Sequence, residues 1–469
     1  MEQAKKFLDE GHPELALERL KKILYEGNFE DEGQIHEMFG ATFHDLANAD
    51  GVTQAYFSAA KTDKILRSQR THFSNYLFAL HYLPKVDAKI LFETAQIYNS
   101  LYREQLTLNK KNLSITKAIY PIKIAFIAPH FLDSSSARFY EKLLTDYDRK
   151  KFFVTAWSLS EREDQFTKKI RASVDKYFDV SEISFEEIAQ KIQAENVDIL
   201  FDLGGHGEGG MTLQVAAYRP AKIQISGIGY FDTTGLDAID YFLTDKFLIA
   251  DNENFFTEQI FELDNAFAFQ PNEKMIQAKK NSSPIPRPSS LTFGCLNNFM
   301  KITDDYLDCV KKILDQVPNS KIVFRDTTPL QSRKNVLNER LIEKFFPEDR
   351  FEIFCGANDF FDDYAKIDLI LDTFPYTGGL MTALALYFEV PVLNLCGKFH
   401  YSRLGADILR ISEQENFIVE NVNDYIKKAV DFAQGNILQK KIRVDKLTDT
   451  KTFAENFYKK LQLNFYTKK

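Results

Sequence analysis

The sequence predicts an α/β protein in which two doubly wound parallel-sheet domains follow a short all-helical region. Three observations support this fold class. Apolar side chains recur at helical spacing over the first hundred or so residues, the remainder alternates β-rich runs with polar helical stretches, and a proline-rich segment divides that remainder. A chain of 469 residues has room for about three domains.

Helical spacing extends from Ala4 to about Glu104. Residues 11–18, Gly-His-Pro-Glu-Leu-Ala-Leu-Glu, predict a turn that leads into a new helix, as in helix-turn-helix solenoid repeats. No period of about 34 residues continues from it, so we expect one degenerate repeat and a helical cap within residues 1–115. Such a surface can bind a peptide, or it can serve as a packing support for the next domain.

The pattern changes at Pro121. Residues 122–128 and 152–157 form β-rich runs, and each is followed by polar helical sequence. Residues 197–203 form a buried strand that leads into the glycine loop Gly204-Gly205-His206-Gly207. Strands that alternate with helices predict parallel βαβ units, and we expect the first α/β domain to span residues 116–280.

A segment with three prolines, residues 281–290, is the predicted linker. After it, strand-helix alternation restarts in a second domain, residues 291–469. The predicted strands there are 291–295, 321–324, 350–354, 369–371 and 390–395. Two doubly wound domains in tandem predict a ligand cleft at the carboxyl ends of their strands.

Charge and cysteine content exclude several classes of protein. Lys+Arg 59 against Asp+Glu 67 gives a net charge of -8, which disfavours a nucleic-acid partner. The four cysteines form no C-x-x-C pair, which argues against a zinc ribbon or a redox motif and favours a reducing cytoplasm. The amphipathic N-terminus has no apolar leader, and no run of 18 apolar residues occurs. We therefore expect a cytoplasmic protein without a membrane span.

Two strand-to-helix junctions in the second domain carry groups suited to a diphosphate. The strand at 369–371 leads into the loop 372–379, and Leu380 to Phe388 forms a plausible helix. Glycines at a helix start let backbone N–H groups approach a phosphate, although a Gly-Gly turn is more often ordinary loop chemistry. The second junction follows the strand at 390–395 and adds cationic side chains. The groups in question are Thr377, Gly378, Gly379, Thr382, Lys398, His400 and Arg403.

Five segments, in order, resemble bacterial SPINDLY-like O-linked N-acetylglucosamine transferases, a group within glycosyltransferase family 41. They are residues 218–241 (YRPAKIQISGIGYFDTTGLDAIDY), 295–302 (CLNNFMKI), 317–320 (VPNS), 371–376 (LDTFPY) and 397–405 (GKFHYSRLG). The resemblance covers roughly residues 60 to 465. It implies a GT-B fold of two Rossmann-like lobes behind tetratricopeptide-like helices, with a UDP-sugar bound on the C-terminal lobe.

The resemblance also implies roles for single residues. Lys301 follows the family's N-N-x-x pattern, and an amine there would stabilise the charge that develops on the leaving UDP without a metal or another cofactor. His206 matches a family histidine that lines the cleft, so Lys301 and His206 are the predicted catalytic residues. The predicted donor-binding residues are Asn298, Lys301, Tyr376, Thr377, Gly378, Gly379, Thr382, Lys398, His400 and Arg403.

The chain departs from the family pattern at two places. Ser134 stands where the family has a histidine after the first strand, and His130 lies nearby. On the predicted donor helix, Leu380 and Met381 replace polar residues, and Leu384 replaces an acidic residue that would accept hydrogen bonds from ribose. Apolar residues at such places weaken binding of a polar ligand.

Two functional hypotheses follow. The first is an inverting glycosyltransferase that moves N-acetylglucosamine or another hexose from a UDP-sugar to Ser or Thr of a protein. The alternative is a catalytically silent GT-B subunit that binds an acceptor peptide or stabilises an active glycosyltransferase partner. A transferase with another nucleotide sugar, or with a non-protein acceptor such as a wall glycan, remains a third option.

Overall fold

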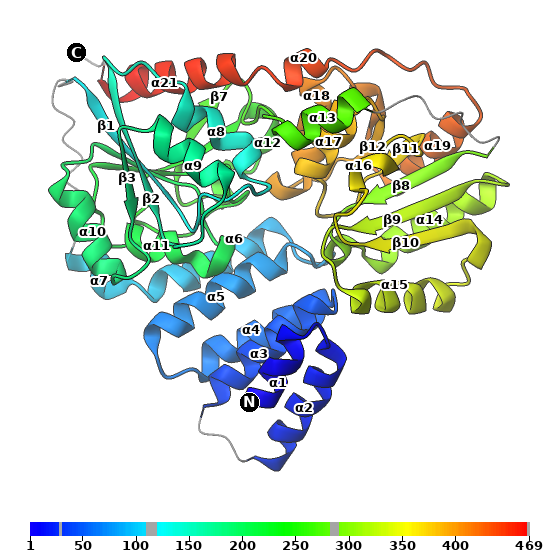
Figure 1. Cartoon of the computed structure of the whole chain (residues 1–469), viewed down its shortest axis with the longest axis horizontal. Coiled ribbons are helices and arrows are strands. Elements are labelled where there is room, and N and C mark those ends of the chain that lie inside the picture. Colours follow the sequence, from blue (N-terminus) through cyan, green and yellow to red (C-terminus); the bar gives the residue numbers. More distant parts are fainter. Residues whose placement is uncertain (28–30, 109–119, 282–289, 467–469) are drawn as a thin grey trace. The chain divides into compact units, whose positions relative to one another are not determined.

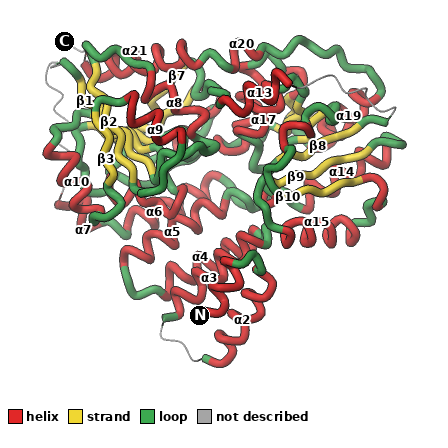
Figure 2. Tube along the Cα trace, in the orientation of Figure 1, coloured by secondary structure: helices red, strands yellow, loops and turns green. Residues whose placement is uncertain are grey.

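A computed structural model of the chain describes residues 1–27, 31–108, 120–281 and 290–466. It confirms the predicted fold class, with a helical N-terminal region followed by two parallel-sheet α/β lobes (Figures 1 and 2). Contacts divide the chain into two units. Unit 1 comprises Met1–Ile65, Ala79–Val86 and Pro271–Leu447, and unit 2 comprises Leu66–Phe78, Asp87–Gln270 and Thr448–Lys469.

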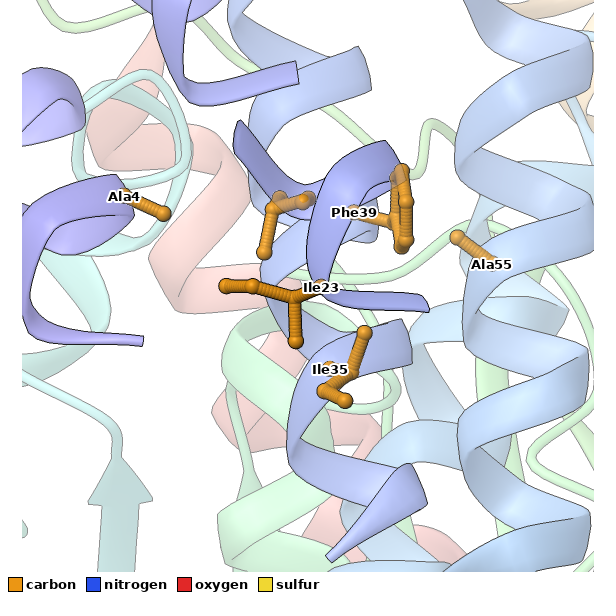
Figure 3. Close-up of a cluster of buried hydrophobic side chains, with 6 residues drawn as sticks. Ala4, Ile23, Ile35, Phe39 and Ala55 are labelled. Atoms are coloured by element: carbon orange, nitrogen blue, oxygen red, sulfur yellow. The ribbon is translucent and has the colours of Figure 1, made fainter. Parts of the chain in front are cut away.

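The N-terminal helices follow from caps and apolar spacing. Pro13 begins α2 in the first-turn position that proline favours, and Asp31, Asn48 and Asp87 cap α3, α4 and α6 with their side chains. The helices are α1 Glu2–Asp9, α2 Pro13–Glu26, α3 Glu32–Asp45, α4 Ala49–Thr62, α5 Leu66–Leu80, α6 Ala88–Ser100 and α7 Arg103–Leu108. Figure 3 shows the buried cluster that joins the first four, formed by Ala4, Leu20, Ile23, Ile35, Phe39 and Ala55.

Unit 2 contains a seven-stranded parallel sheet in the order β3-β2-β1-β4-β5-β6-β7. The strands are β1 Ile122–Ala128, β2 Phe152–Ser158, β3 Lys176–Asp179, β4 Ile199–Asp202, β5 Ile223–Ser226, β6 Tyr241–Asp245 and β7 Gln259–Leu263. The intervening helices are α8 Ala137–Thr145, α9 Gln165–Ser173, α10 Phe185–Ala194, α11 Met211–Ala216 and α12 Lys246–Ile249, with the 3-10 turns η1 Gly207–Gly210 and η2 Glu253–Phe255. Strand order reverses between β1 and β4, which makes the sheet doubly wound.

Unit 1 contains a six-stranded parallel sheet in the order β10-β9-β8-β11-β12-β13, and β8, β9 and β10 lie side by side in Figure 1. The strands are β8 Thr292–Leu296, β9 Lys321–Asp326, β10 Phe351–Cys355, β11 Leu369–Leu371, β12 Val392–Leu395 and β13 Ile418–Val419. The helices are α13 Glu273–Asn281, α14 Asp304–Gln316, α15 Gln331–Glu343, α16 Phe360–Asp363, α17 Leu380–Tyr387, α18 Leu404–Ile411, α19 Val422–Ala433 and α20 Val444–Leu447. The 3-10 turns are η3 Phe299–Lys301, η4 Glu348–Arg350, η5 His400–Ser402 and η6 Glu415–Phe417.

The last described helix, α21 Thr450–Tyr466, packs on the first sheet. The Phe457 ring lies 6.3 Å from the ring of Phe126 on β1 and 5.5 Å from that of Phe201 on β4. We predicted that the second domain extends to residue 469, whereas the contacts assign Thr448–Lys469 to unit 2. The reason is the apolar face of α21, which covers the first sheet.

The other predicted boundaries also differ from the contact units. Residues 1–65 belong with the second sheet, whereas residues 66–78 and 87–270 belong with the first, so the helical region is not a separate unit by contacts. Most of the predicted linker, residues 282–289, and the predicted boundary between residues 115 and 116 lie outside the described residues. The predicted domains stay predictions.

Candidate functional site

The second sheet provides the geometry for a ligand site. Strands β8 and β11 are adjacent, and the strand order reverses between them. In doubly wound sheets, ligands bind outside the carboxyl ends of the strands at such a reversal. The turn that holds Lys301 follows β8, and the loop 372–379 follows β11. The chain topology of unit 1 therefore brings these two predicted segments together.

Lys301 lies directly over the loop that follows β11. Its Nζ donates a hydrogen bond to the carbonyl oxygen of Thr377 at 2.9 Å and lies 3.8 Å from the centroid of the Tyr376 ring. Burial lowers the pKa of Lys301 to about 8, against the opposing effects of Asp372 and Cys295. As a residue, Lys301 is partly exposed, and it places a cation at this edge of the sheet.

Asp372, just after β11, fixes the shape of this loop. Its carboxylate is buried and accepts hydrogen bonds from the amides of Thr373 and Gly378, both at 2.9 Å. It also accepts bonds from the side chains of Asn394 at 2.9 Å and Thr382 at 3.2 Å. Burial raises the pKa of Asp372, although the bonds from Asn394 and the charge of Lys301 oppose the rise. One carboxylate thus joins β11, β12 and the start of α17.

This network uses several groups that we predicted for the donor. The Gly378 amide and the Thr382 hydroxyl both donate to Asp372, and the Thr377 hydroxyl oxygen accepts a bond from the Gly405 amide at 3.0 Å. A Cβ at Gly378 would lie 2.4 Å from the Thr382 oxygen, so the loop needs glycine there. The first amides of α17, from Gly379 onward, are the part of this helix start that can face an anion.

The helix α17 presents a different face from the one we expected. Leu384 is 1% exposed, so it is a core residue and does not occupy the place of a ribose-binding carboxylate. Leu380 and Met381 are partly exposed at the first turn. The apolar character of this helix reflects burial at Leu384, and only its first turn can contact a ligand.

Asn298 is held within the protein by Arg333, a residue that we did not predict. The Asn298 side-chain oxygen accepts bonds from the Met300 amide at 2.9 Å and from Arg333 at 3.0 Å. Arg333, fully buried on α15, also pairs with Asp326 at 2.6 Å and donates to the carbonyl oxygen of His44 at 2.7 Å. Asn298 therefore fixes the turn that holds Lys301 through its bond with the Met300 amide.

The second predicted junction lies beside a separate cavity. The Arg403 guanidinium donates to the carbonyl oxygen of Gly397 at 3.1 Å, and His400 is buried in η5. Lys398 is exposed and lines a cavity of about 440 Å³ together with Phe374, Pro375, Phe399 and residues of α14 and α19. Lys301 and Gly378 do not line it. The cavity and Lys301 therefore lie on different residues of the same loop, with Phe374 and Pro375 at the cavity and Tyr376 and Thr377 at Lys301.

His206 lies in the interior of unit 2. It is fully buried, its Nδ1 lies 2.7 Å from the Ser74 hydroxyl oxygen, and its Nε2 lies 2.9 Å from the Thr234 carbonyl oxygen. A carbonyl oxygen can only accept, so Nε2 carries a proton, and with the ring neutral Ser74 donates to Nδ1. The rings of Tyr98 and Tyr230 pack at 4.7 Å and 5.1 Å. This geometry gives His206 a structural role within unit 2, and its predicted role at the sugar stays a prediction.

His130 lies at the carboxyl end of β1, where the strand order of the first sheet reverses. Its Nε2 is 3.9 Å from the carboxylate of Glu208, and burial lowers the pKa of His130 while Glu208 raises it. Ser134 contacts its own loop, with its hydroxyl 3.4 Å from that of Ser136. His130 therefore stays a partly buried histidine at a strand end of unit 2.

In residues 1–27, 31–108, 120–281 and 290–466, no group of three or more His, Cys, Asp or Glu side chains is placed to hold a metal ion. Within the same ranges, no helix has both the length and the apolar character needed to cross a bilayer.

Sequence reasoning missed two residues that shape the site. Asp372 carries a signal, because it is a charged residue directly after an apolar strand. Arg333 carries none, since it stands in a polar helix whose sequence does not distinguish a buried arginine from an exposed one.

The comparisons with known proteins fit this geometry. The family model for glycosyl transferase family 41 matches residues 96–283. The probable UDP-N-acetylglucosamine–peptide N-acetylglucosaminyltransferase SPINDLY of Arabidopsis thaliana is 30% identical over 338 residues, which cover 69% of this chain and 36% of the relative. The chain belongs to glycosyl transferase family 41.

Other relatives extend the likeness. The protein of Arabidopsis thaliana named SEC, with the same probable transferase description, is 23% identical over 71% of this chain and 36% of its own length. The chain thus spans about a third of the length of the curated relatives it matches. Among solved structures, a mutant of the Thermobaculum terrenum O-GlcNAc transferase aligns with a TM-score of 0.80 at 21% identity, covering 96% of this chain and 87% of that one. That alignment supports the GT-B fold.

Proposed function

We propose that this family 41 chain is an inverting glycosyltransferase that moves N-acetylglucosamine or another hexose from a UDP-sugar to Ser or Thr of a protein in the cytoplasm. The position of Lys301 supports this proposal most strongly. Its ammonium lies at the strand-order reversal of the second sheet, beside the start of α17. A diphosphate there would meet one cation and the first amides of a helix, which are groups that bind phosphate.

In this proposal Lys301 supplies the electrostatic part of the reaction. The acceptor hydroxyl oxygen forms a bond to the anomeric carbon as the bond from that carbon to the UDP oxygen breaks, the hydroxyl proton passes to solvent, and UDP leaves with the developing negative charge. An ammonium held by Thr377 and Tyr376 before the reaction begins would stabilise that charge without reorganisation. Asp372 fixes the loop but faces inward, so it contributes through position alone.

Calorimetric titration with UDP, followed by a panel of UDP-sugars, tests the proposal. We expect binding by wild-type protein and weaker binding by Lys301→Gln, which keeps most of the side-chain length but loses the charge. Mass spectrometry of Ser/Thr peptides incubated with the tightest donor would then detect transfer. No heat with any nucleotide at millimolar concentration would contradict an active transferase.

A second candidate is a catalytically silent subunit that binds an acceptor peptide or stabilises a partner glycosyltransferase. Leu380 and Met381 favour it, because they offer no side-chain hydrogen bond at the first turn of α17. Under this candidate, the chain alone shows neither UDP binding nor transfer, and it raises the activity of an added family 41 enzyme. Co-purification with that enzyme and measurement of transfer by the complex distinguish the two candidates.

A further inference from the structure

The segment Ala79–Val86, here called the Tyr82 segment, belongs to a different unit from its neighbours in sequence. Residues 66–78 and 87–270 are part of unit 2, whereas the Tyr82 segment is part of unit 1. It comprises the last two residues of α5 and most of the connection to α6, and such a connection ordinarily lies on the surface of its own domain. Here it contributes side chains to the interior of unit 1.

Aromatic rings link this segment to Lys301. The Tyr82 ring lies 5.3 Å from the Tyr376 ring, and the Lys301 ammonium lies 3.8 Å from the centroid of that same Tyr376 ring. His81 packs edge-on against Tyr401 at 4.7 Å, and the Tyr401 ring in turn lies 6.2 Å from that of Tyr376. The segment therefore supports the aromatic surface on which Lys301 rests.

The same segment also contacts the turn that holds Lys301. Ala79 and Tyr82 pack in a small apolar cluster with Val52 of α4 and with Met300, the residue before Lys301. Burial raises the pKa of the Tyr82 phenol, and the charges of Arg333 and Asp326 act on it in opposite directions. Arg333 also donates to the Asn298 side chain and to the His44 carbonyl oxygen of α3.

We propose that Tyr82 is a positioning residue for Lys301, because it supports both Tyr376 and Met300 and so fixes where the ammonium meets the donor diphosphate. The proposal rests on the proposed function for its catalytic consequence. The placement of the Lys301 amine by the Tyr82 ring can be tested whether or not the chain is a transferase.

The test measures the Lys301 amine directly. Competitive labelling with acetic anhydride across a pH series, read by mass spectrometry of the peptide that contains Lys301, gives the midpoint of its titration. We expect a wild-type midpoint at about 8. Tyr82→Ala removes a ring that packs on Tyr376 and lets water closer to Lys301, so the Lys301 midpoint should rise by about one pH unit or more. Tyr82→Phe keeps the ring and should retain the wild-type midpoint.

The catalytic consequence is measured in the same variants. Tyr82→Ala should lower turnover, with UDP-sugar at saturation, by about tenfold or more, while Tyr82→Phe stays near wild type. Tyr25→Ala is the matched control, because Tyr25 is 93% exposed and lies in α2. If Tyr82→Ala fails to fold, Tyr82→Leu replaces it, since leucine keeps apolar volume without the ring.

The outcomes separate the two proposals. An unchanged Lys301 midpoint and unchanged turnover in a folded Tyr82→Ala or Tyr82→Leu variant would overturn the positioning role. A shifted midpoint in a protein that neither binds UDP nor transfers sugar would support the positioning of Lys301 and contradict the proposed transferase. A shift in Tyr82→Phe equal to that in Tyr82→Ala would also overturn the role assigned to the ring.

Discussion

The two sheets place an aspartate at the same point of their topology. On the first sheet, Asp202 ends β4 and accepts bonds from the amides of Gly204 at 2.9 Å and Gly205 at 3.1 Å. On the second sheet, Asp372 follows β11 and accepts bonds from the amides of the loop 373–378. Each carboxylate also holds a polar side chain from the next strand, Ser226 on β5 and Asn394 on β12. The doubly wound fold thus builds the same loop support twice.

The difference lies in the side chain placed beside each loop. The first loop carries His206, which is buried and bonded on both ring nitrogens. Beside the second lies Lys301, which keeps partial exposure. A strand-end carboxylate with a glycine loop is therefore a structural device of the fold. Chemical function depends on whether a charged group remains accessible next to it.

The largest expected effect is on the free energy of unfolding. It tests whether α17, after the Asp372 loop, and α11, after the Asp202 loop, are both core helices. Leu384→Asp should lower the free energy of unfolding by about 4 kcal/mol or more, since burial shifts a carboxyl pKa upward by about 3 units or more at about 1.4 kcal/mol each. Leu213→Asp on α11 should behave alike, because Leu213 is fully buried. Urea titration measures both, with Leu384→Met as control. A stable Leu384→Asp variant with tighter UDP binding would show that this helix faces the donor after all.

A somewhat smaller effect separates the two aspartates. Asp372→Ala and Asp202→Ala should each cost about 3 kcal/mol, because each leaves at least two buried donors without an acceptor. Only Asp372→Ala should also weaken UDP binding beyond the loss of folded protein, since only its loop lies beside Lys301. Calorimetry at a temperature where both variants are folded measures this. Equal UDP affinity in the two variants would remove the second loop from the donor site.

The third expectation contrasts the two predicted catalytic residues. Lys301→Ala should reduce turnover by about 10²-fold with little change in melting temperature, as for loss of one preorganised charged donor. His206→Ala should instead cost about 2 kcal/mol of stability, because Ser74 and Thr234 lose their partner. Lys440→Ala is the exposed-lysine control. Full stability of His206→Ala with lost turnover would restore His206 to the reaction.

The smallest expected effect is the change of UDP affinity and of stability with pH that follows from the titration of Lys301. With a pKa of about 8, Lys301 loses its charge as pH rises past that value, so UDP affinity should fall by up to about tenfold per pH unit. The stability of the unliganded protein should change in the opposite direction. From about pH 8 up to the ordinary lysine range, the unfolded chain binds the proton more tightly, so stability rises with pH. Lys301→Gln should abolish both trends.

Much of the fold could be predicted from the sequence. The runs at 122–128 and 369–371 coincide with β1 and β11, because buried parallel strands are continuous apolar segments. Strands β3, β5, β6, β7 and β13 were missed. Strand β5 contains Gln224, a fully buried glutamine whose amide donates to the Ala216 and Ala238 carbonyl oxygens, and β13 has only two residues. Neither of these two strands gives a continuous apolar pattern.

The candidate site could be predicted only in part. The order of motifs placed Lys301 and Thr377 near one another, and the structure brings them to 2.9 Å. The burial of Leu384 and His206 could not be read from single positions, because a residue at a strand end or helix start can face either inward or outward. Arg333 and Tyr82 act through contacts between segments far apart in sequence. The spacing of apolar residues along the chain does not predict such contacts.

The packing of α21 on the first sheet has a consequence for how the protein is made. Phe126 and Phe201 lie on strands synthesised early, whereas Phe457, which covers them, follows the entire second sheet in the chain. Contacts between residues so distant in sequence form late, and an uncovered apolar sheet face is prone to aggregate. The first lobe therefore cannot complete its core during its own synthesis. A ribosome-bound nascent chain that ends at residue 447 would display that face and act as a chaperone substrate.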